Sequence, residues 1–196
     1  MLFFGSLTGP VMAYFLAESY TRTRDVKRYS RRLFLFSLIS WPFYSLFLLR
    51  QWPSVYFSVL TTLWLGLQAI RIWDSGEIPG WAKALLISGL CLLSIFCDWP
   101  VYNVLLPLLM FIFRDRPEAK WRAFALLTLS YAVFMIMLNG NIRASWYQFG
   151  MLLPYFLLRF GFSGEPGSKH PFHKWFFYVF YPLQFALLVA AGGHVY

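Results

Sequence analysis

The feature that most constrains this chain is a series of long apolar segments separated by short segments rich in Arg and Lys. A helix needs about 20 mostly apolar residues to cross the hydrocarbon core of a bilayer, and open structures other than helices leave backbone hydrogen bonds unmade there. The pattern therefore predicts an all-α, polytopic transmembrane helical bundle. We expect about eight spans, at Leu2–Ser19, Leu33–Leu49, Ser54–Trp73, Trp81–Phe96, Val101–Phe113, Trp121–Leu138, Ala144–Phe162 and Lys174–Ala191.

The composition supports a membrane protein without a soluble domain. Hydrophobic residues make up 59% of the chain and charged residues 13%, whereas a soluble domain has about 25% charged residues. The longest hydrophilic segment, Gly164–Lys174, is too short to fold independently. We therefore expect residues 1–196 to form a single integral membrane domain.

The distribution of basic residues predicts the orientation of the spans, because Lys and Arg collect in cytoplasmic loops. With eight spans and the N-terminus outside, 15 of the 17 basic residues fall on one side, and only Arg50 and Arg143 fall on the other. Treating Trp81–Phe113 as one crossing changes the division to 9 against 8. We therefore expect both termini in the periplasm and a tight outer turn at Asp98-Trp99-Pro100.

The net charge of +9 is explained by this topology, so we expect membrane lipids as partners and no nucleic acid. The most basic segment is TRTRDVKRYSRR, residues 21–32. Its arginines, notably Arg22, Arg28 and Arg32, are suited to bind a phosphate-rich ligand such as coenzyme A, because guanidinium groups make paired hydrogen bonds to phosphate. The segment is equally suited to anchor the loop on anionic lipid.

Polar residues at membrane depth are candidates for function. Glu18, near the inner end of the first span, is either an acid, base or substrate contact, or the partner of Arg22 in an ion pair across one helical turn. Asp98 and Asn103 flank the predicted outer turn, and for the carboxylate of Asp98 we favour the capping of the following helix.

The last span begins with HPFHKWFFYVFYPLQ, residues 170–184. Histidine has a pKa near neutrality, so His170 and His173 could act as general bases. We favour the alternative that they are residues of the membrane interface. The helix is expected to start after Pro171. No metal site is predicted, because a zinc site here lacks Cys and acidic ligands. Pro182 should interrupt this helix and free a carbonyl one turn earlier.

Three segments of the sequence resemble the TraX family of bacterial inner-membrane proteins: FLAESYTRTRDVKRYSRRLFLFSLIS, VYFSVLTTLWLGL and KWFFYVFYPLQFALL. The named member of that family is required for N-terminal acetylation of conjugative pilin, and related proteins are associated with fimbrial assembly. The resemblance implies a fold similar to transmembrane acyltransferases, acetyl-CoA as the donor, a pilin or fimbrial subunit as the partner, and the inner membrane as the location.

The sequence departs from the family pattern in two places. In that pattern a further helix comes first and ends in an Asp-His pair, and the last helix reads YPLH, where this chain has Gln184. Either Met1 is internal to a longer gene, or the protein has lost its chemistry and kept a binding role. The matching residues are Glu18, Thr21, Arg22, Tyr29, Arg32, Tyr178, Tyr181 and Pro182.

The resemblance and the spacing together define the candidate site. Tyr178 and Tyr181 share one helical face with Lys174, one turn earlier. We expect Glu18, Tyr178 and Tyr181 as catalytic candidates, with the phenols donating hydrogen bonds to an acyl carbonyl. We expect Lys174, together with the three arginines of residues 21–32, to bind an anionic donor.

The resulting interpretation is an inner-membrane protein of pilus or fimbrial biogenesis, related to a pilin acetyltransferase. Whether it is an enzyme stays open at this point. The alternatives are an active acyltransferase with another base or acceptor, and a transporter or scaffold with the same fold.

Overall fold

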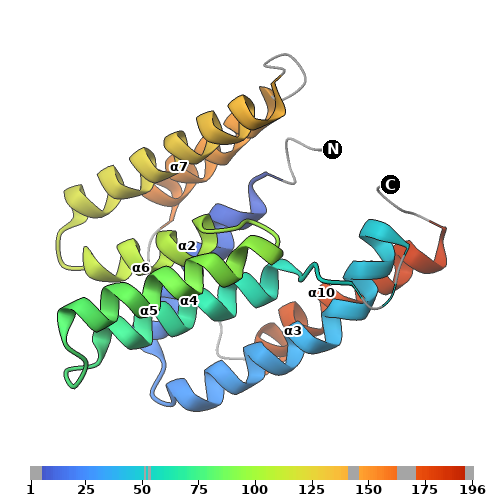
Figure 1. The fold of residues 1–196 in the computed structure, drawn as a ribbon, viewed down its shortest axis with the longest axis horizontal. Coiled ribbons are helices and arrows are strands. Elements are labelled where there is room, and N and C mark those ends of the chain that lie inside the picture. Colours follow the sequence, from blue (N-terminus) through green and yellow to red (C-terminus); the bar gives the residue numbers. More distant parts are fainter. Residues whose placement is uncertain (1–5, 51, 53, 141–145, 163–170, 193–196) are drawn as a thin grey trace.

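The computed structural model describes residues 6–50, 52, 54–140, 146–162 and 171–192, with the backbone alone for residues 146 and 171–178. This part of the chain is helical, which confirms the predicted fold class (Figure 1). The elements are α2 (Thr8–Arg22), α3 (Val26–Leu49), α4 (Val59–Asp74), α5 (Gly80–Leu93), η1 (Ser94–Phe96), α6 (Tyr102–Ile112), α7 (Pro117–Asn139), η2 (Trp146–Leu152), α9 (Leu153–Phe156), η3 (Leu157–Gly161) and α10 (Pro171–Ala190).

A helix or helical run overlaps each of the eight ranges expected to be spans, with η2, α9 and η3 following one another in the seventh. Of the described helices, only α3 and α7 are both long and apolar enough to cross a bilayer by themselves. The structure therefore confirms helices in these places, and two of them have the length and composition of membrane spans. Eight crossings remain a proposal.

The short helix α6 forms the centre of the molecule. Eight of its 11 residues are buried, and it packs against α2, α4 and α7. Its approach to α4 depends on Gly66, where an added Cβ would lie 2.5 Å from the backbone oxygen of Asn103. A side chain at this position would push the two helices apart.

The other helices lie on the two sides of this centre (Figure 1). On one side α7 packs against α6 and against the run from η2 to η3. On the opposite side α3 packs against α4, and α10 packs along α3.

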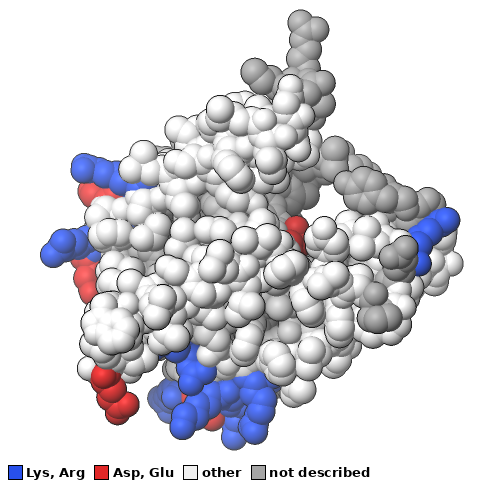
Figure 2. Space-filling model, viewed as in Figure 1, with Lys and Arg blue, Asp and Glu red and all other residues white. Residues whose placement is uncertain are grey.

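The bundle has two distinct ends. At the first, which we call the basic end, α2 leads into α3, α4 into α5, and α6 into α7. Contacts across this end join Glu18 to Lys120 and Tyr20 to Asp74. Figure 2 shows most of the basic atoms along these edges. The second, which we call the far end, holds Arg50, residues 54–58 and the turn 97–101.

Helix α10 differs from the prediction in two respects. It begins at Pro171, three residues before the expected Lys174, because proline fits the first turn of a helix, where an N–H group is not needed. It also continues through Pro182. The missing N–H of a proline removes one hydrogen bond, and the helix continues on both sides of it.

Candidate functional site

Glu18, a predicted catalytic residue, lies in the last turns of α2 between two cations. Its Oε1 is 2.7 Å from Lys120 Nζ of α7, and its Oε2 is 3.4 Å from a guanidinium nitrogen of Arg22. The ion pair with Arg22 considered from the sequence is therefore present, and Lys120 is a second partner of Glu18.

Lys120 is well enclosed at this contact, with 12% of its side chain exposed. Its Nζ lies 4.7 Å from the centroid of the Tyr14 ring, and Tyr14 stacks on Trp121 with ring centroids 5.6 Å apart. The ion pair and the cation–π contact together fasten α2 to α7.

A second group of paired polar residues joins α3 to α4 near the basic end. Trp64 Nε1 and Gln68 Nε2 both donate to Ser30 Oγ, at 3.2 and 2.8 Å. Arg71 donates to Gln68 Oε1 at 2.7 Å. The polar side chains here satisfy one another, as a packed interface requires.

The three arginines predicted to bind a donor have different surroundings. Arg22 pairs with Glu18. Arg28 is exposed and lies 3.5 Å from Asp25, whose side chain also caps α3 by accepting from the Arg28 backbone N–H. Arg32 is partly buried, and its Nε has no hydrogen-bond partner among the described residues. The structure does not gather the three groups around one described point.

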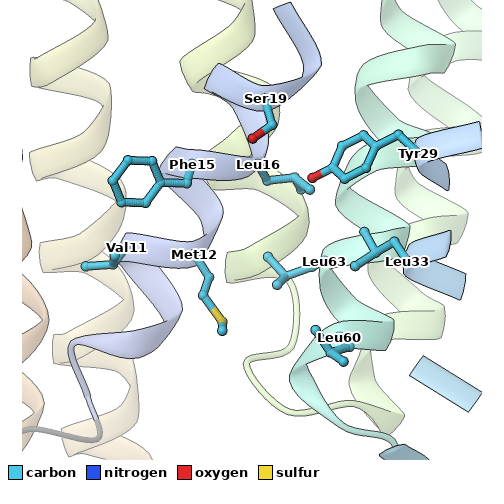
Figure 3. Close-up of a pocket in the computed structure, with 9 residues that line it drawn as sticks. All are labelled: Val11, Met12, Phe15, Leu16, Ser19, Tyr29, Leu33, Leu60 and Leu63. Atoms are coloured by element: carbon cyan, nitrogen blue, oxygen red, sulfur yellow. The ribbon is translucent and has the colours of Figure 1, made fainter. Parts of the chain in front are cut away.

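A cavity of about 460 Å³ lies between α2, α3 and α4, beside the start of residues 21–32. Its lining is apolar apart from Ser19 and Tyr29, which Figure 3 shows close together at one end. The lining residues are Val11, Met12, Phe15, Leu16, Ser19, Tyr29, Leu33, Leu60 and Leu63. The cavity can accept a slender apolar group, with polar atoms only at that end.

At the far end, the predicted tight turn is present and is held by hydrogen bonds to the segment before α4. The Phe57 N–H donates to the Phe96 carbonyl at 2.8 Å, and the Asp98 N–H donates to the Phe57 carbonyl at 2.9 Å. Thr62 Oγ1 donates to the Asp98 carbonyl. Two hydrogen bonds therefore fix the turn to Phe57, before α4, and a third fixes it to Thr62 of α4.

The backbone of this turn is strained. Trp99 has φ 57° and Val101 has φ 61°, a region that is unfavourable for a β-branched residue such as valine. The Val101 N–H donates to the buried Ser94 Oγ at 2.8 Å. The Trp99 ring packs against Gly9 of α2, where an added Cβ would lie 2.5 Å from the ring. Such strain persists only where the surrounding structure fixes it, and it is concentrated at functional sites.

Asp98 carries a partly buried carboxylate at the centre of this turn. Burial raises the pKa of Asp98 to about 6, and the hydrogen bond from the Trp99 N–H opposes that rise. Its carboxylate acts electrostatically on Tyr131 of α7 and Tyr181 of α10. No cation pairs with it among the residues that the structure describes.

Two buried side chains follow in the first turn of α6. The Tyr102 hydroxyl is 2.8 Å from Thr128 Oγ1 of α7 and is thus satisfied. Asn103 is fully buried, and neither its Oδ1 nor its Nδ2 has a partner in the described part of the chain. An orphaned buried amide costs about 1–3 kcal/mol, so its presence calls for an explanation.

Among the residues predicted to form a polar strip on α10, Tyr181 is the one whose side chain the structure describes. This tyrosine is buried and lies near the Val59 N–H at the start of α4. It also lies beside the Ser58 hydroxyl, although that pair does not reach full hydrogen-bonding geometry. The side chains of Lys174, Tyr178, His170 and His173 lie outside the described residues, so the predictions for them stay predictions.

The capping role expected for Asp98 is wrong. Helix α6 has Val101 at its N-cap, with no side-chain hydrogen bond to the first turn. Tyr181 was predicted as a site residue, but its neighbours Asp98 and Tyr131 were missed. In the sequence, Asp98 could have been recognised as a site residue because it is the single carboxylate in the predicted outer loops, which contain few charged residues.

These observations define a helical protein with two helices long and apolar enough to cross a membrane, and with a strained polar turn at one end. A family model described as TraX protein matches residues 1–191. The chain is also 31% identical over 204 residues to the "Probable fimbrial assembly protein FimC, serogroup H1" of Dichelobacter nodosus, a match that covers 96% of this chain and 81% of that protein. The chain therefore belongs to the TraX family. No solved structure matches it significantly.

Proposed function

We propose that this protein acts in the assembly of pili or fimbriae at the bacterial inner membrane. The observation that carries the proposal is the extent of the match, since the similarity to a probable fimbrial assembly protein runs through 96% of the chain. Deleting the gene should abolish surface fimbriae, and a plasmid copy should restore them, as counted by electron microscopy. Normal fimbriae in the deletion strain would contradict the proposal.

The proposed topology has eight crossings with both termini in the periplasm. The division of 15 basic residues against 2 supports this orientation. The helices α2, α4, α5 and α6 would then cross as parts of a packed bundle, because short helices can span only where neighbours cover them. A reporter fused after Tyr196 should be active in the periplasm, and activity in the cytoplasm would contradict this topology.

Acyl transfer to a fimbrial subunit, with acetyl-CoA as the donor, is a second candidate. The cavity between α2, α3 and α4 favours it, since an apolar slot lies beside the arginine-rich residues 21–32. The candidate roles are those expected from the sequence: Arg22, Arg28, Arg32 and Lys174 would bind the donor's phosphates. Tyr178 and Tyr181 would donate to the acyl carbonyl, and Glu18 would remain as acid or base.

The mass of the mature fimbrial subunit separates the two candidates. A loss of one acetyl group in the deletion strain would support acyl transfer. An unchanged mass together with lost fimbriae would support an assembly factor without this chemistry.

Donor binding can be tested in the purified protein. Replacing Arg22, Arg28 and Arg32 by Gln should weaken coenzyme A binding, with each lost charge-assisted contact costing about 1.5–3 kcal/mol. Arg50→Gln, a change at the far end, is the matched control. Unchanged affinity in the correctly inserted triple variant would remove these arginines from the site.

A further inference from the structure

The turn that contains Asp98 has the properties of a binding site for a cation. The described ion pairs of Glu18, Asp25, Asp115 and Glu118 all involve Arg or Lys. Asp98 differs, because no cation lies beside it in the described chain and the hydrogen bond to its carboxylate comes from the adjacent Trp99 N–H. A buried carboxylate is costly unless a cation compensates its charge.

The groups around this carboxylate are acceptors and aromatic rings. Tyr131 and Tyr181 both lie within its electrostatic reach, and each has a phenol oxygen that can accept a hydrogen bond. The rings of Trp99, Tyr102 and Tyr131 pack together, with the Tyr102 and Tyr131 centroids 4.9 Å apart and the stacked Trp99 and Tyr131 rings 6.2 Å apart. Aromatic rings attract cations through their negative faces.

The turn is also rigid. Its hydrogen bonds to Phe57 and Thr62 hold Asp98 in place, and the strained φ angles at Trp99 and Val101 mark a conformation that the fold imposes.

A metal ion fits this turn poorly. The described residues contain no group of three or more His, Cys, Asp or Glu side chains placed to hold one. Hard cations prefer six or more oxygen ligands with several carboxylates among them, whereas this turn offers one carboxylate and phenols. An organic cation with N–H donors matches the available acceptors better.

We propose that the turn binds a primary ammonium group, whose charge pairs with Asp98 and whose N–H groups donate to the oxygens of Tyr131 and Tyr181. The ammonium can belong to the ethanolamine headgroup of a lipid or to a free alkylamine, since both present the same chemistry to the site. The proposal does not depend on the role in fimbrial assembly.

The first test measures thermal unfolding of the full chain in detergent with n-butylammonium chloride, and with n-butanol as the neutral control. A ligand that binds the folded state raises its unfolding temperature by mass action. The wild type should show a rise with butylammonium and none with butanol, and Asp98→Asn should lose the rise. Asp115→Asn, which removes an exposed carboxylate at the basic end, should keep it. No rise in the wild type, or an equal rise in Asp98→Asn, would overturn the proposal.

A second variant probes the site without removing its charge. Tyr131→Phe deletes one phenol oxygen, so the butylammonium concentration needed to raise the unfolding temperature by a given amount should increase several-fold. An unchanged concentration in this variant would remove Tyr131 from the site.

The pH dependence gives an independent readout. The titratable groups that face Asp98 are Cys97, Tyr131 and Tyr181, and all three are uncharged below pH 7. The increase in unfolding temperature caused by butylammonium should therefore disappear as the pH falls through about 6. Asp98 takes up a proton there, while butylammonium stays charged. A rise that persists at pH 4.5 would count against Asp98 as the partner.

Reconstitution distinguishes the two carriers. In nanodiscs of phosphatidylethanolamine the response to butylammonium should be weaker than in phosphatidylglycerol if the lipid headgroup is the occupant. Equal responses in the two lipids would identify a soluble amine as the ligand.

Discussion

Glu18 at the basic end and Asp98 at the far end have opposite surroundings. At the basic end, Glu18 pairs with Lys120 and Arg22, and Ser30 accepts from Gln68. At the far end, Asp98 has no cation beside it and Asn103 has no hydrogen-bond partner among the described residues. The backbone also differs, because Trp99 and Val101 of the far end are strained.

This difference indicates different roles. Paired polar groups at the ends of helices hold a bundle together and fix its orientation in the membrane. Unpaired and strained groups lower stability, so a fold that keeps them gains something other than stability. The comparison therefore supports the proposed binding site at the far end.

The largest expected effect comes from crowding the far-end turn. Gly9→Ala would put a Cβ 2.5 Å from the Trp99 ring, and the strained turn has little room to move. We expect a loss of about 2 kcal/mol in the free energy of unfolding, measured by denaturation in detergent. Gly76→Ala, at the basic end, meets no atom within 4 Å and should be nearly neutral. Equal losses in both variants would show that the far-end turn is not the tighter region.

The next effect tests the pairing at the basic end. Glu18→Gln leaves the enclosed Lys120 without its carboxylate, and we expect a loss of about 1.5 kcal/mol in stability, because an enclosed charge then lacks compensation. Arg22→Gln removes the more exposed partner, with 46% of its side chain accessible, and should cost far less. A larger loss from Arg22→Gln would reverse the assignment of Lys120 as the main partner.

A smaller effect of opposite sign is expected for Asp98→Asn. The pKa of Asp98 is about 6 in the folded protein and 3.8 as a free group, so the folded state loses stability as the pH rises between these values. The asparagine variant lacks this loss and should be more stable than the wild type at pH 7, on the order of 1 kcal/mol. The gap should close near pH 4 in thermal unfolding curves. A variant that is less stable at pH 7 would mean that Asp98 has a compensating partner.

The smallest effect is expected for Arg28→Gln. Its side chain is 69% exposed and pairs with Asp25 across 3.5 Å, so the change should alter stability by less than about 0.5 kcal/mol. The measured loss should shrink further in high salt. A loss above 1 kcal/mol would show that this loop packs more tightly than its exposure indicates.

The sequence predicted the helices well and the site only partly. Apolar runs located every helical segment, since hydropathy acts within a single stretch of chain, although α10 starts earlier than expected at Pro171. The Glu18–Arg22 pair was predicted because it spans one helical turn. The Lys120 contact was not, since 102 residues separate it from Glu18.

The sequence by itself determined the helical class, the uneven distribution of charge and membership of the TraX family, because each depends on residue types and their order along the chain. Only the tertiary structure decided which carboxylate is paired and which is not. Asp98 meets Tyr131 and Tyr181 because α7 and α10 pack beside the turn, and such contacts between distant helices depend on side-chain shapes that local patterns do not record. The burial that raises the pKa of Asp98 exists only once those helices are in place.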